Sequence, residues 1–362
     1  MSRAGGGPVE LAEAIFYCMP ADGPGVPRGG TCDGVTVEEE RVMSIGITMG
    51  DAGGVGPEIA LKSFCEGKLP ANAVVIGDMS VLRFCAAATG CKAPLHHVHS
   101  VNDTVADALN VLDMNLMTTS DIAIGKTSKQ AGKAALAYVN RAVELALRHE
   151  ISAIVTLPMN KDGTRLSAPD FTGHTEVIAG ACGKTDYTMT LVSDRLIVPH
   201  VTAHVSLRRA LDSLSVERIF NVILLARGIA GRLDRGERVA VMGVNPHAGE
   251  NGAFGDEEQR IIGPAVERAR SGGTEVAGPL PPDTVFMRAL RGEFDVVVCM
   301  YHDQGHIPMK TIGFDDTVNV TVGLPIVRTS VDHGTAFDIA YKGVVSVGSF
   351  VHACELAERL AG

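Results

Sequence analysis

The chain has 362 residues, 46% hydrophobic and 20% charged, with a formal net charge of −10 at pH 7. This length suits two lobes or domains better than a single core. The negative balance, without a basic stripe, argues against a nucleic-acid-binding protein. Tryptophan is absent and aromatic residues make up 4% of the chain, which disfavours a stacking platform for sugars or single strands. No apolar run approaches transmembrane length.

Residues 1–42 differ from the remainder of the chain. They are rich in Gly and Pro and end in an acidic run at 38–40. The short apolar patch at 14–19 follows acidic residues and lacks a basic lead, which argues against a signal peptide. We expect a flexible N-terminal extension over 1–42, with Met43 a candidate for the true start. The eight cysteines have no CxxC spacing, which indicates reduced thiols and a cytoplasmic protein.

Strand and helix patterns alternate from Ser44 onward. This alternation predicts an α/β fold with a largely parallel sheet. Strands are expected at 45–49, 73–77, 153–157, 196–201, 238–244 and 295–300, and helices at 79–88, 131–148, 216–227 and 256–270, with a further helix opening at Pro57.

Two glycine-containing loops were weighed as phosphate or cofactor sites. Residues 50–56 form a strand–glycine loop–helix pattern, but the spacing is not GxGxxG, so cofactor contact is only weakly indicated. Residues 124–127 imitate the end of a phosphate loop, but Ser120 stands where that motif requires glycine. We reject the second loop as a phosphate site.

Three predicted strands each deliver a histidine at or just past the carboxyl end: His204, His247 and His302. The strand at 153–157 delivers Asn160 and Lys161 in the same way. Ligands of open α/β sheets bind beyond the carboxyl ends of the strands, so these side chains are expected to gather at one edge.

Three neutral imidazoles around one divalent ion would make an open site, with a position left for water or a substrate oxygen. Asp303 could support His302 or act as a base. His200 and His306 are the residues most easily mistaken for ligands. The alternative stays open that each histidine is an ordinary loop residue.

Anion-binding groups follow the last of these strands. Lys310 and Arg328 supply positive charge and Asn319 adds donors, and Arg can grip a phosphate with two parallel bonds. A metal bound to a hydroxyl would lower its pKa, ease hydride loss and hold an enolate after a carboxylate departs. In the simpler interpretation both cations form surface salt bridges of small energetic value.

Several long motifs resemble one enzyme family. They are GHTE at 173–176, AHVSLR at 203–208, NPHAGENGAFGDEE at 245–258, GPLPPDT at 278–284, YHDQGHIPMK at 301–310 and NVTVGLPIVRTSVDHGTAFDIA at 319–340. These motifs resemble the 4-hydroxythreonine-4-phosphate dehydrogenase (PdxA) family over nearly everything from Ser44 to the C-terminus. ENGAFG, HDQGHIP and the segment 157–161 look closer to the branch acting on 4-phospho-D-threonate and 4-phospho-D-erythronate.

The resemblance implies an isocitrate/isopropylmalate-dehydrogenase-like fold of two α/β/α lobes with a cleft between them. The first lobe, on the cofactor side, would comprise 43–165 and 303–362. The second, 166–302, would carry the metal site and the dimer contacts. The resemblance also implies a homodimer with active sites at the subunit interface. It further implies NAD as the cofactor and one divalent metal per site, which would be zinc or else Mg, Mn or Co. A secondary alcohol would be oxidised, and the resulting β-keto acid would lose carbon dioxide.

By motif, His204, His247 and His302 match the metal ligands, the third being expected from the partner subunit. His174, Thr175, Lys310, Asn319 and Arg328 match substrate contacts. The turn of Asp332, His333, Gly334, Thr335 and Ala336 resembles a cofactor-binding loop. Lys161 and Asp303 are candidates for proton transfer.

The chain departs from the family pattern at two positions. Ala52 stands where the family's first loop has proline, which puts the rigidity of that loop in doubt. Tyr341 replaces a small residue near the expected cofactor and could alter its affinity.

Other functions remain open at this stage. A related enzyme could oxidise an aromatic cis-dihydrodiol carboxylate, with a carboxylate in place of the phosphate. An open histidine site could also serve a metal-dependent hydrolase or aldolase, and a sugar-acid-binding protein is the non-enzymatic alternative. The choice between NAD and NADP is not fixed by the sequence.

Overall fold

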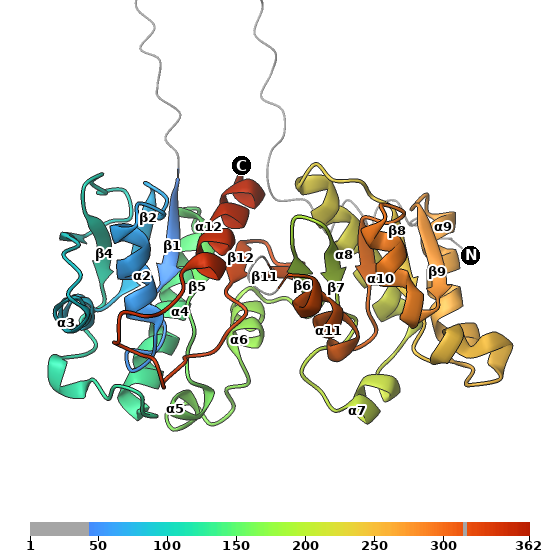
Figure 1. The fold of residues 1–362 in the computed structure, drawn as a ribbon, viewed down its shortest axis with the longest axis horizontal. Helices are drawn as coiled ribbons and strands as arrows, with labels where there is room; N and C mark the ends of the chain where they lie inside the picture. The colour runs from blue at the N-terminus through green and yellow to red at the C-terminus, as the bar shows by residue number, and fades with distance from the viewer. Residues whose placement is uncertain (1–42, 314–316) are drawn as a thin grey trace, which may run out of the picture.

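The computed structural model describes residues 43–313 and 317–362, so the prediction of a flexible extension at 1–42 lies outside the described residues. Twelve strands form one sheet in the order β3-β4-β2-β1-β5-β12-β11-β6-β7-β10-β8-β9 (Figure 1). The predicted α/β class is therefore confirmed.

The strands are β1 Ser44–Thr48, β2 Ala73–Gly77, β3 Leu95–Val98, β4 Leu109–Asp113, β5 Ile151–Thr156, β6 Thr188–Val192, β7 Ile197–Pro199, β8 Val239–Met242, β9 Val276–Leu280, β10 Val296–Val298, β11 Val318–Val322 and β12 Val327–Ser330. The helices are α2 Gly56–Cys65, α3 Met79–Thr89, η1 Thr119–Asp121, α4 Lys129–Leu147, α5 Lys161–Arg165, α6 His174–Ala181, α7 Leu207–Asp212, α8 Val216–Arg232, η2 Pro246–Gly252, η3 Glu258–Ile262, α9 Gly263–Ser271, α10 Pro282–Leu290, α11 His302–Ile312 and α12 Gly348–Ala361.

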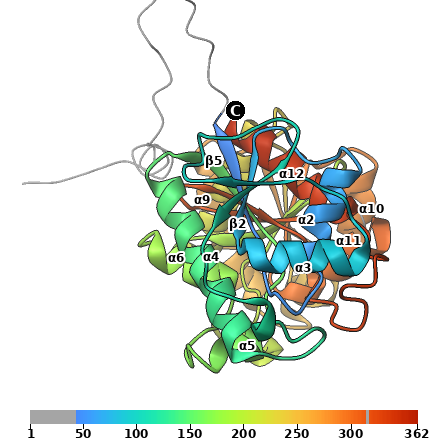
Figure 2. The ribbon, with the colours of Figure 1, turned by 90° about the vertical axis from the view of Figure 1, so that its left-hand side faces the viewer.

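Apolar strands covered on both faces form the core. Every residue of β1, β2 and β10 is buried, as expected for parallel strands between two helical layers. Figure 2 shows α4 on one side of the strands and α2 and α12 on the other. A second, smaller hydrophobic cluster lies around α10, β8 and β10. No described helix is long and apolar enough to cross a membrane.

Most strand pairs are parallel, but three central pairs, β12–β11, β11–β6 and β6–β7, are antiparallel. The sheet is continuous from the strands of 44–156 to those of 188–298, with β11 and β12 between them. The division into lobes at 165 and 303 stays a prediction.

Several predicted elements differ in extent from the structure. The strand expected at 295–300, for example, is only Val296–Val298. The strand expected at 196–201 is only Ile197–Pro199, followed by a single bridge from His200 to Cys299. The helix expected at 256–270 opens with a π-helical turn, η3, before α9. Glu258 of this turn is buried and accepts hydrogen bonds from the backbone of Val244 and Asn245, so η3 is fixed to the loop that follows β8.

Candidate active site

Four histidines form one group at the ends of β7 and β10. The ring centroids of His204 and His302 are 5.6 Å apart, and those of His302 and His306 stack at 3.7 Å. His200 lies 4.8 Å from His306. Because β7, β10 and β8 are neighbours and parallel, their carboxyl ends share one edge, as the sequence predicted.

Three of the four imidazoles have a lowered pKa. Burial, together with the neighbouring histidines, lowers the pKa of His200 to about 3 and that of His306 to about 4. His204 keeps an exposed edge, yet partial desolvation and then the charge of Lys161 lower its pKa as well. Neutral imidazole is the form that binds metal ions.

The start of α11 places His302. Its Nδ1 lies 2.7 Å from Oδ1 of Asp303, and this hydrogen bond lowers the pKa of the Asp303 carboxyl. A histidine that donates Nδ1–H to a carboxylate has Nε2 available for a metal. Gln304 fixes the helix by accepting from the Met300 amide and donating to the Gly243 carbonyl. No motif or spacing in the sequence indicated this role of Gln304.

His247 is placed apart from the other predicted ligands. It lies in η2, where residues 247–251 all have positive φ. Its Nδ1 is 4.0 Å from Oδ2 of Asp283 and its ring is 6.4 Å from that of Phe254. Among residues 43–313 and 317–362, no three His, Cys, Asp or Glu side chains are gathered closely enough to hold a metal. One chain therefore brings together His204 and His302 but not His247, and the three-ligand site stays a prediction.

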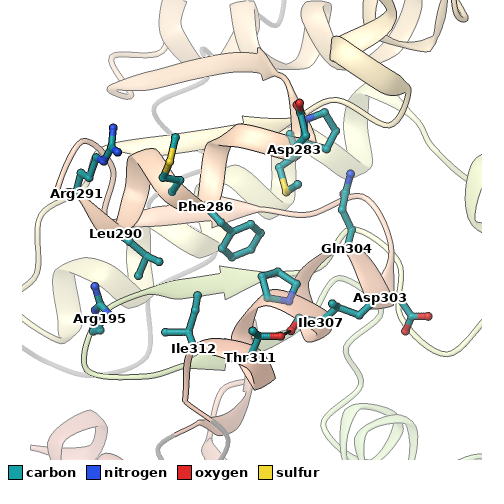
Figure 3. Close-up of a pocket in the computed structure, with 14 residues that line it drawn as sticks. Arg195, Asp283, Phe286, Leu290, Arg291, Asp303, Gln304, Ile307, Thr311 and Ile312 are labelled. Carbon is teal, nitrogen blue, oxygen red and sulfur yellow. Dashed lines mark hydrogen bonds between the residues drawn. The ribbon is translucent and has the colours of Figure 1, made fainter.

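A cavity of about 720 Å³ lies between α10 and α11 (Figure 3). Its wall is largely apolar and includes Phe286 and Leu290, while Asp283 and Asp303 also line it. These carboxylates are the neighbours of His247 and His302 respectively. The cavity thus separates the two histidines within one chain.

Arg328, on β12, is a buried cation without a carboxylate partner among the described salt bridges. Its side chain is 3% exposed. It donates from Nη2 to Thr156 Oγ1 at 2.7 Å and from Nη1 to Thr321 Oγ1 at 3.1 Å. Nη1 also lies 3.4 Å from Thr175 Oγ1. Burial lowers the pKa of Arg328 to about 10, and buried charges are costly unless paired. The geometry fits an anionic ligand.

Three buried polar atoms here lack a partner within the described chain: Nε of Arg328, Nε2 of His174 and Oδ1 of Asn319. Burial, then the charges of Arg328 and Lys161, lower the pKa of His174 to about 3. A neutral imidazole, an amide and a guanidinium can all bond a polar anion. His174, Thr175, Asn319 and Arg328 were each predicted as substrate contacts.

Lys161 links this anion site to the histidine group. Its charge lowers the pKa of both His174 and His204. A Cβ added at Gly173 would lie 2.8 Å from Oε2 of Glu176 and 3.7 Å from Nζ of Lys161, so Gly173 leaves room for the two charges. Burial lowers the pKa of His204 and Arg328, and the charge of Glu176 offsets part of this lowering. Glu176 belongs to the GHTE motif, but its role was not predicted from the sequence.

Lys161 was predicted to lie near the histidines because all these residues follow the carboxyl ends of strands. That reasoning does not explain its position in the structure. Three antiparallel steps separate β5 from β7, so the two strands run in opposite senses and do not share a carboxyl edge. Each step also turns the strand axis by about 20–25°. The segments that follow them, α5 and α7, nevertheless both lie at the bottom of the view in Figure 1.

Lys310 and Asp332 form an ion pair of 3.1 Å. Their charges act on His306, Asp332 raising its pKa and Lys310 lowering it. Lys310, predicted as a substrate contact, thus lies beside Asp332, predicted as a cofactor contact.

The turn 332–336 packs against the first glycine loop. The Val55 amide donates to the Thr335 carbonyl at 3.0 Å, and a Cβ at Gly54 would meet the same oxygen at 2.9 Å. Gly334 is exposed, with nothing within 4 Å of an added Cβ, while His333 Nδ1 contacts its carbonyl at 2.9 Å. The left-handed φ of 42° at Ala336 gives the turn its tight bend.

The two departures from the family pattern contact each other. The buried Tyr341 hydroxyl donates to the Ala52 carbonyl at 2.6 Å. Asp51 further orders this loop, since its Oδ1 accepts from the Gly53 amide and its own amide donates to Pro158. Tyr341 therefore braces the loop that lacks proline.

Comparisons with known proteins agree with this architecture. A family model for the pyridoxal phosphate biosynthetic protein PdxA matches residues 70–357. D-threonate 4-phosphate dehydrogenase of Salmonella typhimurium is 46% identical over 326 residues, covering 89% of this chain and 100% of the relative.

Two solved structures are also similar. The crystal structure of 4-hydroxythreonine-4-phosphate dehydrogenase from Klebsiella pneumoniae is 45% identical with a TM-score of 0.82, covering 90% of this chain and 99% of that chain. A terephthalate 1,2-cis-dihydrodiol dehydrogenase from Burkholderia xenovorans is 29% identical with a TM-score of 0.63, covering 88% and 98%. The extent of these matches shows that the chain belongs to the PdxA family.

Proposed function

We propose that this protein is an NAD- and divalent-metal-dependent dehydrogenase of a 4-phosphorylated hydroxy acid. It would oxidise the secondary alcohol of 4-phospho-D-threonate, 4-phospho-D-erythronate or 4-phosphohydroxy-L-threonine, and the β-keto acid would then lose carbon dioxide. Relatives named as dehydrogenases of D-threonate 4-phosphate and 4-hydroxythreonine 4-phosphate support this substrate class.

The observation that carries the proposal is the buried guanidinium of Arg328, bonded only to threonine hydroxyls and with a free Nε. A phosphorylated acid would supply the negative charge that the site lacks. His174, Thr175 and Asn319 would then orient the substrate from the same region, and Lys310 would add a second cation near the histidine group.

The predicted metal would be held by His204 and His302 together with His247. The fit rests on neutral imidazole at His204 and on the Asp303 carboxylate, which leaves Nε2 of His302 available. When bound, such an ion polarises a hydroxyl or carbonyl oxygen of the substrate. Lys161, whose charge acts on both His174 and His204, would move a proton between substrate and solvent, and Asp303 would keep the ring of His302 oriented.

NAD would be the hydride acceptor and would lie along the turn 332–336. The open space beside Gly334 fits a ligand that approaches the backbone closely. Asp332 and His333 would present polar groups to it, and Thr335 and Ala336 would hold the turn against the first glycine loop.

A homodimer would complete the site. Apolar side chains are exposed beside each predicted ligand: Leu207 is 56% exposed after His204, Phe254 is 52% exposed beside His247 and Ile307 is 64% exposed on α11. Exposed apolar groups that cluster around functional residues are typical of protein interfaces.

The test is NADH formation by the purified full-length chain with a divalent metal and 4-phospho-D-threonate, followed by detection of carbon dioxide. NADH formation only with the phosphorylated acid supports the proposal. Metal-dependent turnover without any nicotinamide signal would instead indicate a hydrolase or aldolase, and tight binding without turnover would indicate a binding protein.

A second candidate is oxidation of an aromatic cis-dihydrodiol carboxylate. The 29% identity to a dihydrodiol dehydrogenase favours it as the runner-up. NADH formation with a dihydrodiol carboxylate, and none with the phosphate esters, would select this function.

A further inference from the structure

We propose that His97 and His99 form a surface site for a divalent transition-metal ion, separate from the predicted active-site metal. Residues 95–99 read Leu-His-His-Val-His. His97 lies in β3 and His99 directly after its last residue, Val98. Among the described strands, β3 lies at the edge of the sheet and pairs with β4 alone.

The spacing places both rings on one face. Side chains two apart on a strand point to the same side, whereas the intervening residue points to the other. The centroids of the His97 and His99 rings are 4.6 Å apart and their planes are inclined by 53°. Ring nitrogens lie at the ring edges, so they can approach one another more closely than the centroids. Two imidazoles can then share one ion at about 2.0–2.1 Å from each nitrogen.

The surroundings favour a hydrated, exchangeable ion. His97 and His99 are both exposed, while Val98 between them is buried and anchors the strand. No third His, Cys, Asp or Glu joins them within the described chain, so water would fill the remaining positions. Imidazole nitrogens suit Ni²⁺, Cu²⁺ and Zn²⁺, whereas Mg²⁺ and Ca²⁺ prefer oxygen ligands.

The site is independent of the proposed function. β3 is the first strand in the sheet order, and the strands that carry the histidine group, β7 and β10, are in the opposite half. A Ni²⁺ titration of the full chain would therefore count an ion here in addition to any ion at the predicted active site.

Ni²⁺ titration of the full chain tests the site, with diethylpyrocarbonate modification of each histidine mapped by peptide mass spectrometry. Ni²⁺ is expected to protect His97 and His99. The matched controls are His96, which neighbours them on the opposite face of β3, and the exposed His149 on another part of the surface. H97A or H99A should weaken this Ni²⁺ site by about 10²-fold, because the remaining imidazole loses the gain from a second tethered ligand. H96A should leave it unchanged.

Equal protection of His96 and His149 would overturn the proposal, because it would mean that Ni²⁺ binds surface histidines without selection. Unchanged affinity in H97A or H99A would overturn it as well. All three substituted residues are at least partly exposed on an edge strand, and a melting curve without metal checks that each variant is folded.

Discussion

At the scale of single residues, Arg328 shows most clearly how a side chain can lower the stability of the fold and still serve ligand binding. Burying an unpaired ion costs several kcal/mol even after the protein relaxes, and three threonine hydroxyls replace only part of its hydration. A buried charge that lowers the stability of the fold is expected to have a function, such as binding a ligand. The substrate would supply the missing charge.

Arg328→Met should therefore raise the free energy of unfolding of the free protein by about 1–4 kcal/mol, because an apolar side chain of similar length replaces a buried charge. It should also raise KM for the phosphorylated substrate strongly and abolish the rise in Tm on adding that substrate. Urea denaturation and thermal melts measure both effects. Arg227, in an exposed ion pair with Glu237, is the matched control, with an expected change within about 0.5 kcal/mol. A destabilised Arg328→Met protein would contradict the argument.

His174 predicts a specific dependence of stability on pH. Its folded-state pKa is about 3, against about 6.5 in an unfolded chain. Between these values the unfolded chain binds a proton that the folded chain does not, so the free energy of unfolding falls as the pH falls from about 6.5 towards 3. His174→Asn removes this contribution, and its urea midpoint should lose less between neutral and acidic pH than that of the wild type. His149→Asn, on the exposed surface, is the comparison. An unchanged slope for His174→Asn would show that the ring takes up its proton normally.

At the scale of elements, the cofactor region depends on how closely two loops approach. Gly54 has no side chain where Thr335 packs, and Gly125 similarly faces the Phe337 carbonyl at 2.8 Å from an added Cβ. The Tyr341 hydroxyl bonds the same loop. The backbone of 50–56 and the turn 332–336 thus form one packed unit.

Gly54→Ala should push the loop 50–56 away from the turn 332–336, because the added methyl group would clash with the backbone of Thr335. We expect a loss of about 1–3 kcal/mol in the free energy of unfolding and a higher KM for NAD, with a smaller change in KM for the acid. Gly180→Ala is the matched control. Gly180 lies in α6 with nothing within 4 Å of an added Cβ, so its replacement should stabilise the helix by about 0.5–1 kcal/mol. Equal KM values for NAD in Gly54→Ala and wild type would exclude the turn as the cofactor site.

The sequence predicted what depends on local pattern. Buried strands such as 73–77 and the three histidines at strand ends follow from short apolar runs and the residues after them. It missed the antiparallel centre, because the pairing of β11 with β6 and β12 joins segments far apart in the chain. Contacts between distant segments also explain why Glu258 and Gln304 were not predicted. These two residues hold the loops that carry His247 and His302. The position of Glu176 beside Lys161 was missed for the same reason.

At the scale of the whole molecule, one chain presents an incomplete set of predicted ligands. His204 and His302 lie together, whereas His247 contacts Asp283 and Phe254 instead. An exposed apolar residue follows each of them along the chain, at Leu207, Phe254 and Ile307. One chain thus holds two of the three predicted ligands together, and the expectation that a partner subunit supplies His302 stays a prediction.

Mixing inactive variants tests this assembly directly. If each site takes His204 and His302 from one subunit and His247 from its partner, a heterodimer of H247A and H302A chains has one site with both substitutions and one intact site. Random exchange of equal amounts should then restore about a quarter of the wild-type NADH formation, since about half the dimers are mixed and each has one intact site. A mixture of H204A and H247A chains should restore the same fraction of NADH formation as the mixture of H247A and H302A. H204A mixed with H302A should stay inactive, because every mixed site lacks one ligand. Recovery in that last mixture would place His204 and His302 on different subunits, and no recovery in any mixture would confine all three ligands to a single chain.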